Sequence, residues 1–280
     1  MVAPVENIRH CTGRASLEVQ LVSGESAVTS SYATNPLKLL TPHARGLSVW
    51  ACTSSFGGGL VAGDQTTLDL RIGAGSRCFL GTQASTKIYR NPAALPSGHE
   101  TRAILEDGSL LVFAPDPVQA FAGSTYAQRQ KFRLASNASL VLLDWFTSGR
   151  AARGERWEFD RFQSRNDVFV DETRVFLDSL LLTLDDGALT APHRMGRFNC
   201  LATLFLVGPA VRVTAKQLLE QISKEPMSRR PSLVVSASPV AGGSVLRLAG
   251  ENVEAVGHEL HGRLALLRDL LGDDPWSRKW

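Results

Sequence analysis

The 280-residue chain is 44% hydrophobic and 20% charged, a composition typical of a globular protein with a large buried core. Thirty Lys and Arg against 27 Asp and Glu give a net charge of +3, and the two signs are interspersed along the chain. These values argue against a dedicated nucleic-acid-binding protein, which would carry its basic residues in blocks.

The four cysteines are widely separated and form no CxxC pair, which predicts neither a zinc site nor a disulfide framework. A reducing cytoplasm is the simpler inference. Residues 1–14 carry charged side chains where a secretory signal needs an unbroken apolar stretch. The longest apolar run, 201–211, is too short to span a bilayer and is interrupted by Gly208 and Pro209. We therefore expect a cytoplasmic protein without a membrane segment.

Short runs with the alternating period of β-strands, punctuated by Gly, Pro, Asn and Asp, dominate the chain as far as residue 206. They indicate an all-β sandwich, barrel or coil. The predicted strands are 17–22, 46–53, 67–72, 78–89, 109–113, 126–134, 140–146, 155–162 and 175–184.

The C-terminal part changes to a helical period. Residues 214–224 predict a short amphipathic helix that Thr214 can cap, and 252–271 predict a longer one, capped by Asn252 and ended by Gly272. Between them, 232–237 and 244–249 predict a β-hairpin. We expect one domain over 1–280: a β-rich body at 1–210, two helices flanking the hairpin at 211–272, and a loose tail at 273–280.

The densest glycine cluster, 56–64, raises the idea of a phosphate-binding loop, but an alternating segment follows it where such a loop needs a helix. We therefore interpret the glycines as permitting a sharp corner or a close backbone approach. The members of this structural motif are Gly57, Gly58, Gly59 and Gly63, and Asp64 at the end of the corner is the side chain with functional interest.

Residues 82–90 read as an extended segment with polar side chains on both faces. A strand between two dry layers would not tolerate these side chains, so the segment either lies on a sheet edge or lines a hydrated interior space. Thr86 lies within it, and Lys87 is a charge partner for a nearby carboxylate under either interpretation.

Residues 144–159 join two predicted strands through a loop rich in arginine and glycine. The acidic residues beside the arginines favour a salt-bridged loop over a nucleic-acid-binding one. Its structural motif comprises Gly149, Arg150 and Gly154.

Glu254, His258 and His261 share one face of the last predicted helix and have ligand-like spacing. A solvated helix flank is the more ordinary interpretation, because nothing nearby completes a coordination shell. They stay a candidate metal site.

Five segments, in order and in register, resemble the UreD family of urease accessory proteins, called UreH in some organisms. The segments are GGGLVAGDQ, TQASTKIYR, PDPVQAFAGSTYAQ, TSGRAARGERWEFDRFQSR and FLDSLLL. The resemblance is clear from residue 35 to residue 182 and weaker after residue 210. It implies a mainly β fold, either β-helical or a two-layer open-faced β sandwich, with two C-terminal α-helices.

The resemblance also implies a scaffold without catalytic activity. Family members bind UreF, which recruits the GTPase UreG, and the complex inserts nickel into apo-urease (UreABC), with UreE acting indirectly as a nickel supplier. GTP belongs to UreG, so we expect no tightly bound cofactor in this chain and at most Ni²⁺ in transit. We expect neither nucleic-acid nor membrane partners.

An internal passage for nickel is proposed for the family, and matching of motifs assigns residues of this chain to it. The matched residues are Asp64, Thr86, Asp144 and Asp178. We expect Glu155 and Lys87 to line the passage beside them. Two alternatives stay open: a β-rich carbohydrate-active enzyme using Asp144 and Glu155 as acid and base, and a protein-interaction module unrelated to urease.

Overall fold

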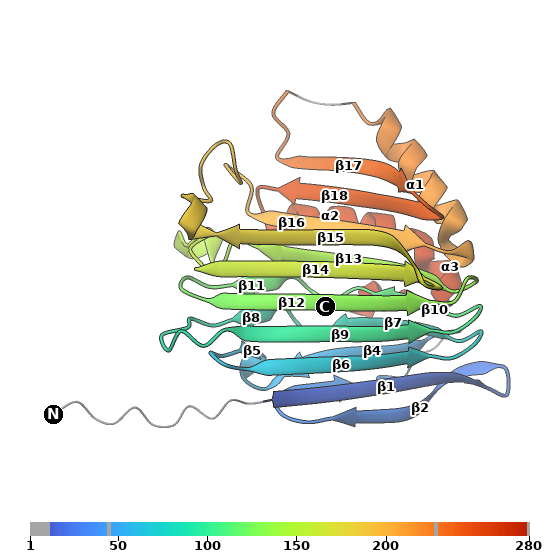
Figure 1. Ribbon diagram of the computed structural model, residues 1–280. Coiled ribbons are helices and arrows are strands. Elements are labelled where there is room, and N and C mark those ends of the chain that lie inside the picture. Colours follow the sequence, from blue (N-terminus) through green and yellow to red (C-terminus); the bar gives the residue numbers. More distant parts are fainter. Residues whose placement is uncertain (1–11, 44–45, 227–228, 279–280) are drawn as a thin grey trace.

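The computed structural model describes residues 12–43, 46–226 and 229–278, which form two β-sheets packed face to face with helices behind one of them (Figure 1). Within these ranges the first sheet has seven strands in the order β15-β14-β12-β9-β6-β1-β2. Its strands are β1 (Thr12–Val22), β2 (Glu25–Ala33), β6 (Gln65–Ile72), β9 (Ser97–Leu105), β12 (Thr125–Leu134), β14 (Arg161–Val170) and β15 (Thr173–Thr183).

The second sheet has eleven strands in the described ranges, eight of them in the order β17-β18-β16-β13-β10-β7-β4-β3. These are β3 (Leu37–Leu40), β4 (Val49–Ser55), β7 (Arg77–Thr82), β10 (Leu110–Phe113), β13 (Ser139–Thr147), β16 (Cys200–Val207), β17 (Leu233–Val240) and β18 (Gly243–Gly250). Three short strands, β5 (Gly59–Leu60), β8 (Thr86–Ile88) and β11 (Val118–Ala120), pair with one another in parallel, and β11 joins them to β13.

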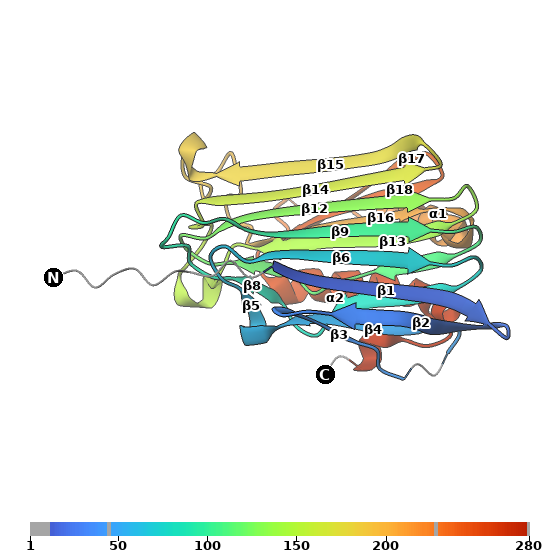
Figure 2. The ribbon, with the colours of Figure 1, turned by 60° about the horizontal axis from the view of Figure 1, so that its bottom comes forward.

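The chain winds as a solenoid through the middle of the molecule. From β4 to β14 the main strands alternate between the second and the first sheet, and neighbouring main strands within each sheet are parallel. Antiparallel strands finish both ends of each sheet. Figure 2 shows β2 and β3 together at one side, whereas β15 and β17 are the terminal strands of their sheets at the other.

The helices cover the outer face of the second sheet. They are α1 (Arg212–Lys224), α2 (Val253–Leu264) and α3 (Arg268–Leu271), with 3₁₀ turns at Phe56–Gly58, Ala151–Arg153, Leu184–Asp186, Pro209–Val211, Ala265–Leu267 and Pro275–Arg278. Leu218 of α1 and Leu260 of α2 pack in one apolar cluster with Val112 and Leu204 of the sheet. None of the helices in the described ranges has the length and apolar character needed to traverse a bilayer.

The fold class expected from the sequence, mainly β with two C-terminal helices, is confirmed. The hairpin is present as β17 and β18, and the Asn252 side chain caps α2 by accepting a 2.8 Å hydrogen bond from the Ala255 amide. Capping by Thr214 is wrong, because Pro209 starts a 3₁₀ turn and α1 then begins at Arg212, so Thr214 lies inside the helix.

Two predicted strands differ from the structure. The run 78–89 is broken into β7 and β8 by a bend at 83–85, and 155–162 is largely loop, with β14 beginning only at Arg161. The end of the chain also differs from the expected loose tail. The Trp276 ring packs edge-on against Phe79, with ring centroids 5.3 Å apart.

Two apolar clusters occupy the space between the sheets. One includes Leu17, Phe132 and Leu142, and the other includes Phe146 and Phe162. On β13, Leu142 belongs to the first cluster and Phe146 to the second, so the residue between them on the same face, Asp144, lies at the boundary of the two. A polar band follows this boundary across the molecule. It consists of Asp144 on the second sheet and, on the first sheet, Thr66, His99, Thr101, Gln128, Gln130, Ser164, Asn166 and Asp178.

Candidate functional site

A row of polar side chains crosses the inner face of the first sheet. Thr66 pairs with His99, His99 with Gln128, and Gln128 with Ser164 in the parallel registers of β6, β9, β12 and β14. Because aligned residues of neighbouring strands lie side by side and point to the same face, these four form one ladder. A parallel row beside it contains Thr101, Gln130 and Asn166, which are also buried, and Asp178.

Asp144 faces this ladder from the second sheet and is its main hydrogen-bond acceptor. Oδ1 accepts a 2.9 Å bond from Gln128 Nε2, and Oδ2 accepts bonds from Ser164 Oγ (2.6 Å) and Asn166 Nδ2 (2.8 Å). Only 8% of Asp144 is exposed. Three donors thus hold a buried carboxyl group in one orientation between the sheets.

Burial dominates the acid–base behaviour of Asp144. Loss of water raises the pKa of this carboxyl above its ordinary value, the three side-chain hydrogen bonds oppose the rise, and nearby Asp178 adds to it. The group is therefore easier to protonate than a surface aspartate.

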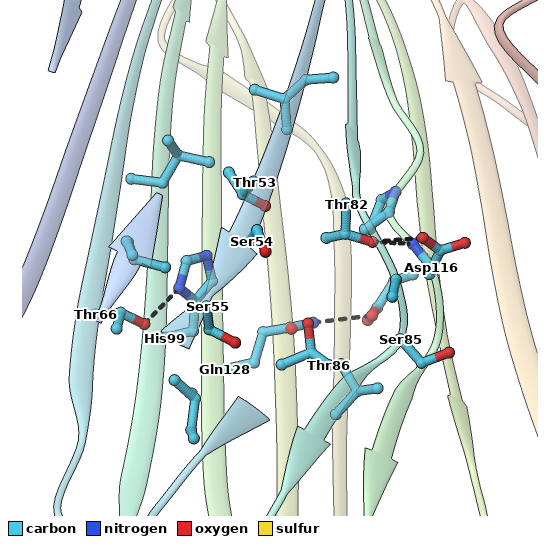
Figure 3. Close-up of a pocket in the computed structure, with 18 of the residues that line it drawn as sticks. Thr53, Ser54, Ser55, Thr66, Thr82, Ser85, Thr86, His99, Asp116 and Gln128 are labelled. Atoms are coloured by element: carbon cyan, nitrogen blue, oxygen red, sulfur yellow. Dashed lines mark hydrogen bonds between the residues drawn. The ribbon is translucent and has the colours of Figure 1, made fainter. Parts of the chain in front are cut away.

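A cavity of about 90 Å³ lies beside Asp144, between the two sheets. Figure 3 shows hydroxyl, amide and carboxyl groups converging on it, among them Ser55, Thr86 and Gln128. Its other lining residues with hydroxyl, amide, imidazole or carboxyl groups include Thr53, Ser54, Thr66, Thr82, Ser85, His99, Asp116 and Gln130. The space has room for several water molecules, each of which needs roughly 10–15 Å³.

A groove of about 290 Å³ continues from Asp144 to the molecular surface between the terminal strands β15 and β17. Asp144 lies on the wall of both the cavity and the groove. At the mouth, Asp178 of β15 accepts a 3.3 Å hydrogen bond from Arg247 of β18. The polar band therefore runs from the cavity past Asp144 to an opening.

The structure brings three of the six residues expected in a passage to this band. Thr86 lines the cavity, Asp144 lines both the cavity and the groove, and Asp178 lines the groove. Asp64 instead closes its own turn, with Oδ2 accepting a 2.9 Å bond from the Val61 amide. Lys87 lines a separate pocket near the 149–153 loop.

Glu155, the sixth residue, belongs to the arginine loop. Burial alone would raise its pKa, but hydrogen bonds from Arg150 and the Ala122 amide outweigh burial and bring the pKa below its ordinary value. The expected salt bridge is present, because Arg150 Nε donates a 2.8 Å bond to Glu155 Oε2. Glu155 lines neither the cavity nor the groove, so it does not share a site with Asp144 as an acid–base pair would.

The glycine motifs have the expected structural explanation. A Cβ on Gly59 would lie 2.2 Å from the Lys87 carbonyl oxygen, so β5 can approach β8 only without a side chain. A Cβ on Gly149 would lie 2.9 Å from Glu155 Oε1. The motif glycines with positive φ are Gly57, Gly58, Gly63, Gly149 and Gly154.

The candidate metal site on the last helix is not assembled. Glu254 and His258 are exposed on α2, and the His261 ring lies 6.5 Å from the Trp276 ring, centroid to centroid. Within the described parts of the chain, no three His, Cys, Asp or Glu side chains are grouped to hold a metal ion.

Several members of the band escaped the sequence analysis: Thr66, His99, Thr101, Gln128, Gln130, Ser164 and Asn166. A signal was present, because 127–131 and 163–167 are polar at inward as well as outward strand positions, the feature that drew attention to 82–90. The register of five strands was needed to place these residues together.

The solenoid-like body and its hydrogen-bonded polar interior define a mainly β protein with an internal cavity of about 90 Å³. Comparison with known proteins identifies the family. Residues 11–280 match the family described as UreD urease accessory protein. Urease accessory protein UreD of Sorangium cellulosum is 48% identical over 269 residues, which cover 96% of this chain and 84% of that protein.

Two further relatives carry corresponding names. Urease accessory protein UreD of an Anaeromyxobacter species is 40% identical over 95% of this chain and 89% of its own length. Urease accessory protein D of Arabidopsis thaliana is 33% identical over 92% of this chain and 98% of its own length. The chain belongs to the UreD family of urease accessory proteins.

Proposed function

We propose that this chain is a non-catalytic scaffold for urease maturation, which forms a complex with UreF and the GTPase UreG and helps to insert nickel into apo-urease. Membership of the UreD family supports the urease accessory role. GTP hydrolysis takes place on UreG, and UreE supplies nickel indirectly. The scaffold itself transforms no substrate and works in the cytoplasm.

In this proposal Ni²⁺ travels between the two sheets of the scaffold. The observation that carries the proposal is that Asp144, inside the band of polar side chains, lines both the cavity and the groove. Oxygen donors with retained water bind Ni²⁺ loosely enough to release it, whereas clustered Cys or His would hold it. Thr86, Asp144 and Asp178 line the route.

The other three expected residues act on the shape of the route. Asp64 fixes the turn that leads into β6, and Glu155 fixes the arginine loop through Arg150. Lys87 belongs to β8, whose first residue, Thr86, lines the cavity. Their substitution would act through the positions of lining residues.

Asp144→Asn tests the proposal, because it removes the charge at the junction of cavity and groove and nearly preserves the shape of the side chain. The variant is co-expressed with UreF, UreG and urease, and urease nickel content is measured by mass spectrometry beside urease activity. We expect both to fall severalfold while UreF still co-purifies with the chain.

Asp167→Asn is the matched control, since Asp167 lies on the same strand as Ser164 but on the outer face, paired with Arg165 at 2.7 Å. Equal nickel loading with both variants would overturn the passage. Failure of the unsubstituted chain to co-purify with UreF would instead favour an interaction module unrelated to urease.

A further inference from the structure

The outer face of the second sheet is hollowed at the end where the short strands β5, β8 and β11 lie (Figure 1). On β13, Trp145 packs in the apolar cluster beneath the helices, but Thr147, two residues further along the same face, lines a pocket of about 670 Å³. Lys87 of β8 and Gln119 of β11 are aligned in register with Thr147 and line the same pocket. We call it the larger pocket, and Val253, the first residue of α2, lies on its wall.

Two aromatic side chains are shared by the larger pocket and a neighbouring one of about 620 Å³, the smaller pocket. Tyr89 and Phe121 line both, and their rings meet edge-on with centroids 5.6 Å apart. The Tyr89 hydroxyl donates a 2.9 Å hydrogen bond to the Gly57 carbonyl oxygen, and the Arg150 guanidinium lies 4.6 Å from the centroid of the Phe121 ring. Both aromatic side chains are half-buried, so each is held in place while part of it stays accessible.

Cationic side chains surround the two rings. Lys87, Arg150 and Arg153 line the larger pocket, and Arg90 and Arg150 line the smaller one. Glu155 balances the charge of Arg150 through their salt bridge. In the part of the chain that the structure describes, Lys87, Arg90 and Arg153 form no salt bridge. Three cations thus border the aromatic pair with their charges unbalanced.

The acidic side chains nearby do not cancel this charge. Glu251, on the wall of the larger pocket, is balanced by Arg197, whose Nε lies 2.6 Å from its Oε1. Glu254 lies in the first turn of α2, where the positive end of the helix dipole favours a carboxylate. Neither residue lines the smaller pocket, and the exposed Glu158 and Asp160 line neither pocket. Positive charge is therefore in excess around the rings.

We propose that this surface, the two pockets that share Tyr89 and Phe121, is a docking site for an acidic segment of a partner protein. Carboxylates of the segment meet Lys87, Arg90 and Arg153, and one apolar side chain packs on the aromatic pair. Tyrosine, phenylalanine and arginine are enriched in protein interfaces, and unbalanced charges at their rim steer a partner of opposite sign. The two pockets share no lining residue with the cavity or the groove, so the inference goes beyond the proposed function.

Peptide binding to the full chain tests the inference. The probe is a rhodamine-labelled Glu-Glu-Phe-Glu-Glu peptide, followed by fluorescence anisotropy at low ionic strength. Gln-Gln-Phe-Gln-Gln lacks its charges, and Glu-Glu-Ala-Glu-Glu lacks its ring. We expect each of these counterparts to bind at least about fivefold more weakly, the scale set by exposed ion pairs and by one aromatic contact.

Substitutions on the chain locate the binding. Lys87→Gln combined with Arg153→Gln removes two of the unbalanced cations. The matched control is Arg129→Gln combined with Lys131→Gln, because these side chains are exposed on β12, on the outer face of the first sheet. Once circular dichroism has established equal folding, we expect the affinity for the acidic peptide to fall about fivefold in the first variant and less than about twofold in the control. Equal losses in the two variants, or equal affinities for the three peptides, overturn the docking site.

Inorganic phosphate distinguishes a docked segment from a small anion. The acidic peptide is bound to the full chain and phosphate is added at constant ionic strength. Retained peptide binding supports the acidic segment. Complete displacement by millimolar phosphate would assign the surface to a small oxyanion and overturn the proposal.

Discussion

Asp144 and Ser164 belong to different sheets, yet the Ser164 hydroxyl lies 2.6 Å from Oδ2 of Asp144. This bond ties the two layers together at a level where apolar packing lies on either side. Buried polar networks of this kind are often matched or exceeded in stability by apolar packing of the same volume. The band is therefore better explained by function than by stability.

Removal of the Asp144 carboxyl group should destabilise the fold, because the buried side chains that donate hydrogen bonds to it would lose their acceptor. Asp144→Ala leaves donors of Gln128, Ser164 and Asn166 without their acceptor. We expect the free energy of unfolding to fall by about 2–3 kcal/mol. Urea denaturation measures it, and the exposed outer-face change Asp69→Ala should shift it by less than about 0.5 kcal/mol. Similar losses in both variants would contradict the network.

The raised pKa of Asp144 predicts a pH dependence of stability. Since the folded pKa lies above the ordinary value of 3.8, the folded state binds more protons between the two values, and the unfolding free energy falls as pH rises through that window. The difference between wild type and Asp144→Asn, followed by urea denaturation against pH, should decrease across it. A difference that increases with pH would show that the hydrogen bonds outweigh burial.

The lowered pKa of His99 predicts a pH dependence of stability opposite to that of Asp144. Its folded pKa of about 4 lies below the ordinary 6.5, so the unfolded state binds more protons in between, and stability is lost as pH falls from 6.5 toward 4. The full loss is on the order of 3 kcal/mol, at 1.36 kcal/mol per pKa unit. His99→Gln should lack this component in urea denaturation. An NMR titration of the ring with a midpoint near 6.5 would disprove the burial argument.

Two glycines of the corner, Gly57 and Gly59, should respond differently to substitution by alanine. Gly59→Ala drives a methyl group into the Lys87 backbone and should cost about 3 kcal/mol of unfolding free energy. Gly57→Ala meets nothing within 4 Å and should cost only about 1–2 kcal/mol, from its positive φ of 74°. Thermal and urea unfolding of both variants check the order, and a milder effect at Gly59 would contradict the close approach of β5 to β8.

The fold class, the two helices and most of the main strands could be predicted from the sequence. The spacing of apolar residues, every second position in strands and every third or fourth in helices, indicates which face of each element is buried. It failed where polar residues point inward. The strand β9 begins Ser-Gly-His-Glu-Thr and β14 contains Gln-Ser-Arg-Asn-Asp, so neither showed the alternation used to find strands. His99 and Gln128 were missed as site residues, because only the inter-strand register makes them neighbours.

The site residues were predicted unevenly for a physical reason. Asp144 interrupts an apolar strand, which is visible in the sequence, and the structure places it in the band. Asp64 and Glu155 also stand beside glycines, but their carboxylates accept local backbone or arginine hydrogen bonds. A loop carboxylate that caps its own turn and one that faces a cavity look alike until the chain is folded.

Obstruction of the groove tests the passage most directly. Ser236 is exposed on β17 and lines the groove, and Ser238 is exposed on the same strand outside it. Urease nickel content is measured after activation with Ser236→Trp or Ser238→Trp in the complex, once equal co-purification with UreF is established. We predict that Ser236→Trp lowers nickel content severalfold and Ser238→Trp leaves it unchanged. Full nickel content with Ser236→Trp would contradict transit between the sheets.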